Sequence, residues 1–396
     1  MRHRSNQIWQ GKNRQAHHRK QGMASSHAWH SRTDRINGHW PVPVPLMPNE
    51  LFSTWLVRAA LAQGIDVLVL AGYLWPKWRA CTTDLDRGLS AGRMAILAEK
   101  SGIDAVALRS ASLLPIAMAI GVNPHPTHPV WPWVLALGSR NRKRHGGLQY
   151  CAACLASDSV PYFRLQWRLA WHTCCSSHRA RLYDRCWRCH APLEPTRLSA
   201  FATITSCASC EVDLRQGAWR PASESALAFQ EYADAVARSG SGGYGQANLR
   251  ADEWFCLSRY FLMLLRCAVR RQTSALSKCL INLDRRVTEL RSPQTGLIFE
   301  MLSTLERSQF LGCVSALIQA GPDSLRNAIS EQAVNPTSLR QEWQSLPRHI
   351  QNLVDGTPNA LCLRKKTDRK SNHRPLTPHG VLRKWARLQR KVRMKI

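Results

Sequence analysis

The sequence has few acidic residues and no long apolar stretch. Among 396 residues, 26 Asp and Glu stand against 55 Lys and Arg, which gives a net charge of +29 and a pI near 10.4. The most apolar stretch, residues 105–122, is interrupted by Arg109 and Pro115, so we expect no membrane span. The first 40 residues contain no apolar core of a signal peptide. We therefore expect a cytoplasmic, nucleoid-associated protein, with nucleic acid as a more natural partner than an anionic membrane.

Two common catalytic motifs are absent as well. The chain contains neither a P-loop, G-x-x-x-x-G-K-[ST], nor the zinc-protease motif H-E-x-x-H. Asp84 and Asp86 form a close carboxylate pair, but no third acid completes a nuclease-like metal cluster. Their position favours helix capping or pairing with Arg87. We predict that the protein is not an enzyme and has no catalytic residues.

Cysteine is plentiful, and its spacing is regular. Four pairs separated by two residues provide eight candidate metal ligands: Cys151 and Cys154, Cys175 and His178, Cys186 and Cys189, and Cys207 and Cys210. A two-residue gap lets one tight turn aim both side chains at one ion, and zinc prefers thiolate and imidazole ligands. Pairing in chain order gives one site with three thiolates and an imidazole and a second site with thiolates only, although a cross-braced pairing stays open. Since each set supplies four protein ligands, we predict two structural Zn2+ ions.

The other cysteines and histidines allow alternative ligand choices and alternative cysteine chemistry. A secreted disulfide framework would also use many cysteines, but the regular spacing favours zinc in a reducing compartment. Cys175, rather than the adjacent Cys174, has the two-residue spacing to His178, and His172 and His190 are spare imidazoles. The remaining cysteines lie in apolar surroundings and predict buried free thiols: Cys81, Cys256, Cys267, Cys279, Cys313 and Cys362.

Composition and periodicity predict a mainly α-helical protein. We expect a disordered basic arm (1–40), an N-terminal helical domain (41–149), a tandem zinc-knuckle or zinc-ribbon region (150–220), a C-terminal helical domain (221–362) and a basic tail (363–396). The Gly/Ser-rich residues 239–248 predict a flexible linker. Residues 95–109 predict a helix, a turn at Gly102 and a second helix, which is a helix-turn-helix or an ordinary helical hairpin.

Basic residues indicate where DNA would bind. Residues 364–396 and 1–40 supply +12 and +7 of the net charge, a pattern typical of tails that bind polyanions, although such tails also simply aid solubility. Arg164 and Arg168 have helical i,i+4 spacing and are expected to face solvent or phosphate. The candidate DNA contacts are Arg109, Arg140, Arg142, Lys143, Arg144, Arg164, Arg168, Arg364, Lys365, Lys366, Arg383 and Lys384.

Three sets of residues together resemble one family. Residues 48–58, PNELFSTWLVR, are similar to the P-x-E-S-x-x-S-W-x-x-R opening of the TniQ/TnsD transposition proteins, and Asp84-Leu85-Asp86-Arg87 resembles their D-x-D segment. The zinc region matches from Tyr150 through the Y-F-R-x-x-W string at 162–167 to Cys189, and the resemblance spans about residues 46–215. Four positions depart from the family pattern without touching a ligand: Leu51, Thr54, Ala152 and Ser176.

The resemblance implies a role in DNA transposition. Proteins of this family select target sites by linking a target to an AAA+ ATPase regulator, which then recruits the transposase. We expect an adaptor that binds DNA or a target-bound complex, with the oligomeric state, a homodimer included, left open. The alternatives are a stand-alone zinc-containing DNA-binding transcriptional regulator and, third, a zinc-dependent nucleic-acid enzyme.

Overall fold

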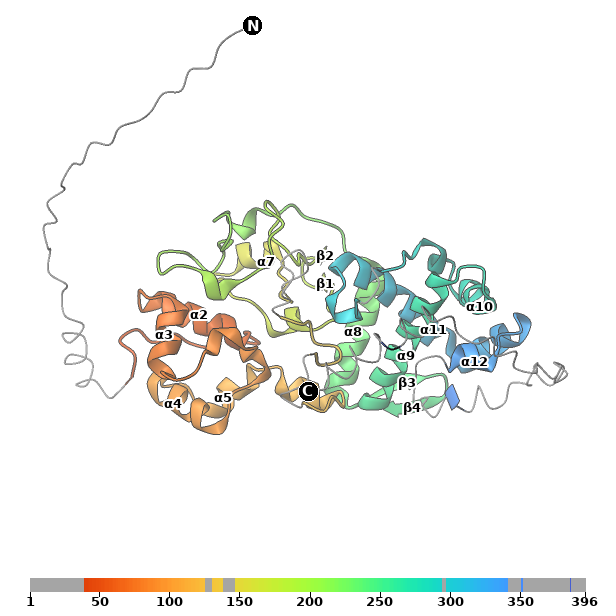
Figure 1. The fold of residues 1–396 in the computed structure, drawn as a ribbon, viewed down its shortest axis with the longest axis horizontal. Helices are drawn as coiled ribbons and strands as arrows, with labels where there is room; N and C mark the ends of the chain where they lie inside the picture. The colour runs from red at the N-terminus through yellow and green to blue at the C-terminus, as the bar shows by residue number, and fades with distance from the viewer. Residues whose placement is uncertain are drawn as a thin grey trace, which may run out of the picture. The chain divides into compact units, whose positions relative to one another are not determined.

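A computed structural model describes residues 39–124, 130–137, 147–293, 297–340, 350–351 and 385. It is mainly helical, with 53% helix and 7% strand, which confirms the predicted fold class. The helices and strands are α2 (Phe52–Ala62), α3 (Val67–Leu74), α4 (Ala91–Ser101), α5 (Ala105–Ser110), α6 (Leu114–Ala119), α7 (Ala152–Ser157), β1 (Cys174–Cys175), β2 (Ala180–Arg181), α8 (Glu224–Ser239), β3 (Ser241–Tyr244), β4 (Ala247–Arg250), α9 (Ala251–Arg270), α10 (Ala275–Leu283), α11 (Thr304–Glu331) and α12 (Pro336–Leu339) (Figure 1).

The chain divides into two compact units that interleave along the sequence. Unit 1 comprises Met1–Pro115, Ala152–Arg168 and Arg185–Gly217, and unit 2 comprises Ile116–Cys151, Leu169–Asp184 and Ala218–Ile396. The predicted domains were continuous stretches, whereas the predicted zinc region contributes segments to both units. The predicted arm and tail lie outside the described residues, apart from His39, Trp40 and Trp385.

Unit 1 is built on short helices with buried apolar faces. In α2, Phe52, Trp55 and Leu56 are buried. Helix α4 ends at Gly102, which adopts the left-handed conformation (φ 69°) that glycine tolerates best. Asp104 then caps α5, because its carboxylate accepts hydrogen bonds from the Val106 and Ala107 amides. The predicted helix, glycine turn and second helix are therefore present, and the two helices are in contact.

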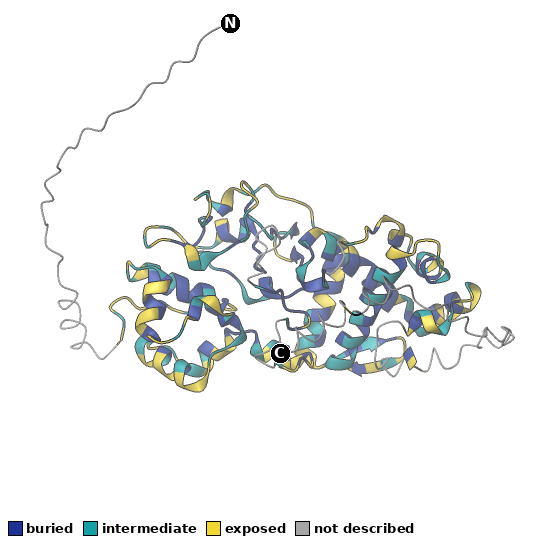
Figure 2. Ribbon diagram, viewed as in Figure 1, coloured by how far each residue is buried: buried dark blue, intermediate teal, exposed yellow. Residues whose placement is uncertain are grey.

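Unit 2 has a helical core formed by α8, α9 and α11, which contact one another (Figure 1). The apolar stripes of α9 and α11 are buried, including Trp254, Phe261 and Val314. Figure 2 shows the same inward burial as dark blue segments on these helices. Trp133 lies within an aromatic cluster, with ring centroids 5.6 to 6.4 Å from those of Trp171, Phe229, Phe255 and Phe299. Such contacts stabilise a core beyond the area they bury.

The prediction of a flexible linker at 239–248 is wrong. Strands β3 and β4 pair antiparallel there, and Tyr244 is buried. The turn packs closely against the break in α11 at Gly321-Pro322, and a Cβ on Gly245 (φ 59°) would lie 2.5 Å from Pro322 Cδ. Glycine is needed here for close backbone approach and not for flexibility.

Candidate metal centres

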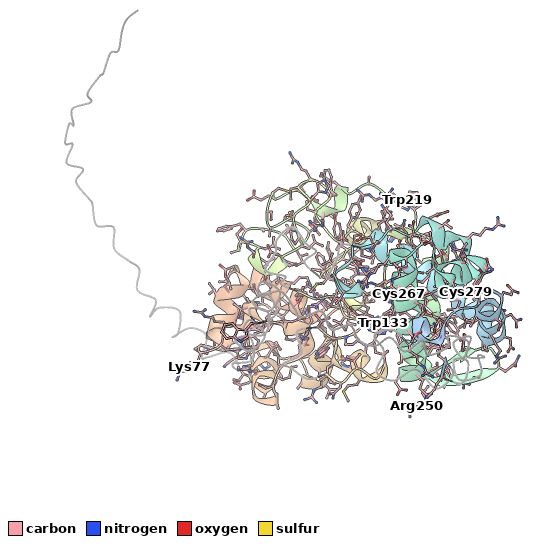
Figure 3. All side chains as sticks on the ribbon, turned by 45° about the vertical axis from the view of Figure 1, so that its right-hand side comes forward. Lys77, Trp133, Trp219, Arg250, Cys267 and Cys279 are labelled. Carbon is pink, nitrogen blue, oxygen red and sulfur yellow. The ribbon has the colours of Figure 1, made fainter. Side chains whose placement is uncertain are left out.

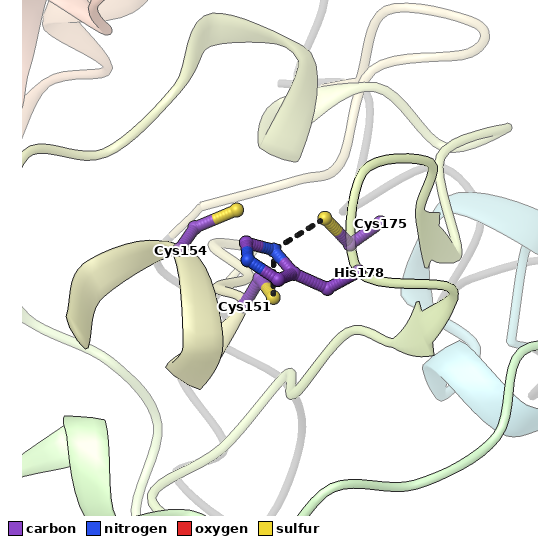
Figure 4. Close-up of side chains that lie close together, drawn as sticks. All are labelled: Cys151, Cys154, Cys175 and His178. Carbon is purple, nitrogen blue, oxygen red and sulfur yellow. Dashed lines mark hydrogen bonds between the residues drawn. The ribbon is translucent and has the colours of Figure 1, made fainter. Parts of the chain in front are cut away.

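The first four ligand candidates form one cluster (Figure 4). Cys151 precedes α7 and Cys154 lies in its first turn, while Cys175 ends β1 and His178 lies in the turn before β2. All four ligand atoms lie within 4.8 Å of one another. His178 presents Nδ1 to the thiols, 3.5 Å from Cys175 Sγ and 3.8 Å from Cys151 Sγ. The three cysteines are buried, and His178 is half-buried.

Buried polar side chains from α8 and α11 hold the backbone on both sides of this cluster. Arg307 donates to the Ala170 carbonyl oxygen and to Gln149 Oε1, both at 2.7 Å. Gln230 accepts from the Cys174 amide at 3.2 Å and donates to the Cys174 carbonyl oxygen at 3.0 Å. Burial is the main cause that lowers the Arg307 pKa, to about 10. The segments that carry Cys151 and Cys175 are therefore fixed by the core of unit 2.

The other four candidates form a second cluster of sulfur atoms within unit 1. Cys186 Sγ lies 3.7 Å from Cys210 Sγ, and Cys189 Sγ lies 3.7 Å from Cys207 Sγ. All four lie within 4.8 Å of one another, with Cys189 exposed and Cys210 half-buried. These sulfur–sulfur separations are far longer than the roughly 2.0 Å of a disulfide bond. The two clusters correspond to the chain-order pairing and not to the cross-braced one.

Two near-identical turns build the second cluster. The Cys186 amide donates to the Ala191 carbonyl and the Cys207 amide to the Val212 carbonyl, at 3.0 and 2.9 Å. The residue that follows each pair adopts a left-handed conformation, at φ 56° for His190 and 60° for Glu211. Arg179, which follows His178, does the same at φ 46°. Such a conformation is uncommon for non-glycine residues, and sequence reasoning missed it because no glycine marks these positions.

The spare cysteine and histidines lie elsewhere. Cys174 Sγ is buried 3.6 Å from Thr173 Oγ1 and belongs to neither cluster. His172 Nε2 lies 2.8 Å from Asp234 Oδ1, and the Trp171 indole donates to the same oxygen. Asp234 was not predicted, because an acid in a helical pattern such as that of α8 normally indicates a solvated face.

The geometry of both clusters fits a tetrahedral ion of the size of zinc. Bonds of about 2.3 Å to sulfur and 2.0 Å to nitrogen place two sulfurs about 3.8 Å apart, and a sulfur and a nitrogen about 3.5 Å apart. The sulfur separations of 3.7 Å and the Cys175–His178 separation of 3.5 Å match these values. Burial is the largest cause that raises the pKa of the Cys186 thiol, to about 12, so the thiolate form needs a neighbouring cation.

Arg168 lies in a buried ion network rather than on a helical surface. Its segment is a 3-10 turn, Leu165–Arg168, and its side chain is 0% exposed. The guanidinium contacts Asp86 at 2.5 Å and Asp84 at 2.8 Å, and the Ser53 amide donates to Asp86 at 2.7 Å. Burial, the largest cause, raises the Asp86 pKa to about 6. A phosphate cannot reach Arg168 in this arrangement, so the expectation that it faces solvent or phosphate is corrected.

The other candidate DNA contacts differ in position. Arg109 is exposed on α5. Arg164 pairs with Asp158 at 2.7 Å, and its guanidinium lies over the rings of Tyr162 and Trp167. The other candidates lie outside the described residues: Arg140, Arg142, Lys143, Arg144, Arg364, Lys365, Lys366, Arg383 and Lys384.

One G-x-S-x-G string, the pattern of serine-hydrolase nucleophile elbows, occurs at residues 88–92. Ser90 is the residue before α4, and a 3-10 turn rather than a strand precedes it. Its side-chain oxygen lies 3.5 Å from Arg93 Nη1. A nucleophile elbow requires a strand, a sharp turn and a helix, so this string is a helix start.

Fold and site together define a mainly helical protein with two four-ligand cysteine and histidine clusters. The TniQ family model matches residues 41–182, which identifies a TniQ domain and confirms the resemblance seen in the sequence. This domain associates the chain with transposition. The match includes the opening motif, the Asp84–Asp86 segment and the first cluster, and it ends before Cys186. A comparison with curated proteins finds no match.

Within the described ranges, no single helix is both long enough and apolar enough to cross a membrane. Helices α2 and α3, bent by 100° at the short break between them, meet the length and composition requirements only as a pair.

Proposed function

We propose that this protein is a target-selection adaptor for DNA transposition, which binds DNA or a target-bound complex and recruits an AAA+ ATPase regulator. The transposase is then engaged through that ATPase. The TniQ domain at residues 41–182 is the observation that carries the proposal. Recruitment by binding, with no bond cleavage by this chain, is the role that such a domain implies.

The two clusters support a scaffolding role for the metal in this proposal. Each cluster offers four protein ligands, which is a complete tetrahedral set for zinc. A catalytic zinc site keeps one position for water or substrate, whereas a structural site fills all four with side chains. We therefore propose two structural Zn2+ ions, and the free energy of metal binding at such sites contributes directly to folding.

Charge supports DNA as the partner. Residues 1–40 and 364–396 contribute +19 of the net +29, and the attraction of such segments to a polyanion falls steeply with salt. On the described surface we retain Arg109 as a proposed DNA contact, because it is exposed on α5. Arg164 and Arg168 are withdrawn from this role, since internal carboxylates already pair with both. We also propose that the protein is cytoplasmic and associates with the nucleoid.

Co-purification tests the proposal. The full chain is mixed with an AAA+ ATPase regulator of the proposed class and with duplex DNA on beads, and ATPase retention is measured over a salt series. We expect the ATPase to be retained only when the chain is present. Deleting residues 364–396 should weaken DNA binding. It should also reduce the slope of log affinity against log salt concentration by about 0.9 for each phosphate that the tail no longer neutralises.

A matched control keeps the length of the tail. Replacing its Lys and Arg with Gln should have the same effect as the deletion if charge is responsible. Unchanged affinity and unchanged salt slope in both variants would refute the electrostatic assignment. Specific DNA binding with no ATPase retention would instead favour the stand-alone transcriptional regulator.

A further inference from the structure

A short strip of unit 2 combines arginines with an exposed tryptophan. Residues 219–222 run antiparallel to β2: the Arg181 amide donates to the Arg220 carbonyl at 2.8 Å, and the Ala222 amide to the Arg179 carbonyl at 3.0 Å. Ala180 is buried, while Arg179 is exposed and Arg181 is half-buried. We call Arg179, Arg181, Trp219 and Arg220 the Trp219 strip.

Trp219 is held at one edge, and most of its ring is open. Its indole nitrogen donates to the His178 carbonyl oxygen at 3.2 Å, while the residue is 64% exposed. Figure 3 shows Trp219 at the margin of the described fold. A single exposed apolar residue is ordinary by itself. What distinguishes Trp219 is that a hydrogen bond orients its ring within a short strip that also carries three arginines.

The strip carries positive charge that local acids balance only in part. Arg179 pairs with Glu224, and both side chains are largely exposed. The Arg220 guanidinium lies 4.5 Å from the centre of the Tyr183 ring, which orients it without neutralising it. No carboxylate lies within ion-pair distance of Arg181 or Arg220 in the part of the chain that the structure describes. Arg181 and Arg220 therefore add to the strip two guanidinium groups that have no ion-pair partner among the described residues.

An open aromatic ring in the same strip as arginines without ion-pair partners fits single-stranded nucleic acid. Proteins that bind such strands stack bases on aromatic side chains and attract the backbone with cations, with little sequence preference. In an intact duplex the base faces are already stacked and unavailable. A protein partner fits less well, because the strip offers only one large apolar side chain beside its cations.

We propose that the Trp219 strip binds an unpaired nucleic-acid strand, with Trp219 stacked on a base and with Arg181 and Arg220 contacting phosphates. The inference rests on the proposed function, in which this protein binds DNA. It specifies further that the bound strand is unpaired and names the residues that contact it. The first metal cluster also acquires a positioning role, since His178 is both a candidate ligand and the acceptor of the Trp219 hydrogen bond.

Photocrosslinking locates the contact in the intact protein. A single strand of about 20 nucleotides carrying 5-iodouracil, long enough to exceed one binding site, is irradiated with the full chain, and the modified peptide is identified by mass spectrometry. We expect Trp219 to be the principal cross-linked residue, and excess unlabelled single strand to suppress the adduct more than excess duplex. Cross-links confined to residues 1–38 and 352–396 would overturn the proposal.

Affinity measurements provide the second readout. The ratio of single-strand to duplex affinity is used, because the basic ends contribute to both. Trp219→Ala should lower this ratio about 5- to 150-fold, and Trp219→Phe should restore part of it. Arg181→Gln with Arg220→Gln should reduce the single-strand salt slope by about 1.4. Phe201→Ala, at a residue 99% exposed in unit 1, is the matched control and should change nothing.

Metal content verifies that each variant has folded. If Trp219→Ala keeps its metal and its single-strand affinity, the inference fails while the adaptor proposal stands. If Trp219→Ala keeps its nucleic-acid affinity but loses the ATPase, the strip is a protein contact and the inference fails. If the wild-type chain retains neither DNA nor ATPase, the proposed function itself fails.

Discussion

The two candidate metal clusters have the same number of candidate ligands but very different surroundings. In the first, the three cysteines are buried, and Arg307 and Gln230 fix the neighbouring backbone from α11 and α8. In the second, Cys189 is exposed, and the turns depend mainly on their own backbone hydrogen bonds. The first cluster is therefore held by side chains from the helical core of unit 2, whereas the second is partly open to solvent.

The largest expected effect comes from removing a ligand of the first cluster. Cys175→Ala should prevent stable folding of the core around the cluster, because structural zinc contributes about 10–16 kcal/mol in small domains and a whole protein is stable by only about 5–15 kcal/mol. Thermal unfolding and metal content measure the effect. Cys174→Ala is the matched control, since the adjacent thiol is buried outside the cluster. Equal damage from both variants would contradict the ligand assignment.

Arg307 should matter almost as much, because its support is what distinguishes the first cluster. Arg307→Met should destabilise the protein by about 3–5 kcal/mol, since it removes the buried donor to the Ala170 carbonyl oxygen and one of the two donors to Gln149 Oε1. Denaturant unfolding measures this loss. Arg326→Met on the same helix, at a side chain 54% exposed, should cost at most about 1 kcal/mol. Similar costs for the two arginines would argue that α11 does not support the cluster.

Loss of a ligand from the second cluster should have a local effect. Cys186→Ala should release one metal ion and make residues 186–217 sensitive to protease, because the ion would no longer join the turn at Cys186 to the turn at Cys207. The core of unit 2 should keep its unfolding midpoint. Limited proteolysis with peptide mapping distinguishes this outcome from global unfolding, which would show that the second cluster is as integral to the fold as the first.

The smallest difference should appear in the rate of metal loss. A chromogenic chelator should remove metal in two phases, with the fast phase from the second cluster because Cys189 is exposed there. Cys186→Ala should leave only the slow phase. A single phase in the wild type, or a fast phase that survives in Cys186→Ala, would reverse the comparison.

The two clusters could be predicted from sequence because their information is local. A two-residue spacing encodes a turn, and the four such pairs between residues 151 and 210 come together as two groups of four. The hydrogen bonds from Arg307 that hold the backbone beside the first cluster could not be predicted, since Arg307 lies 137 residues from Ala170. An arginine in a helical pattern normally indicates a solvated face. The Arg168–Asp86 pair spans 82 residues in the same way.

The predictions that the structure corrects share a physical cause. Residues 239–248 have the composition of a linker, but Gly245 is needed because a Cβ at this position would clash with Pro322. Arg164 and Arg168 were expected to lie on one helical face, whereas the backbone forms a 3-10 turn that buries Arg168. In each case a long-range contact overrides a local pattern.

Metal stoichiometry tests the central claim most directly. Native mass spectrometry of the full chain, together with elemental analysis, should show two zinc ions per chain. Cys174→Ala should keep two, and Cys186→Ala should keep one. Fewer than two ions in the wild type, or two ions retained in Cys186→Ala, would contradict the account of two closed structural sites.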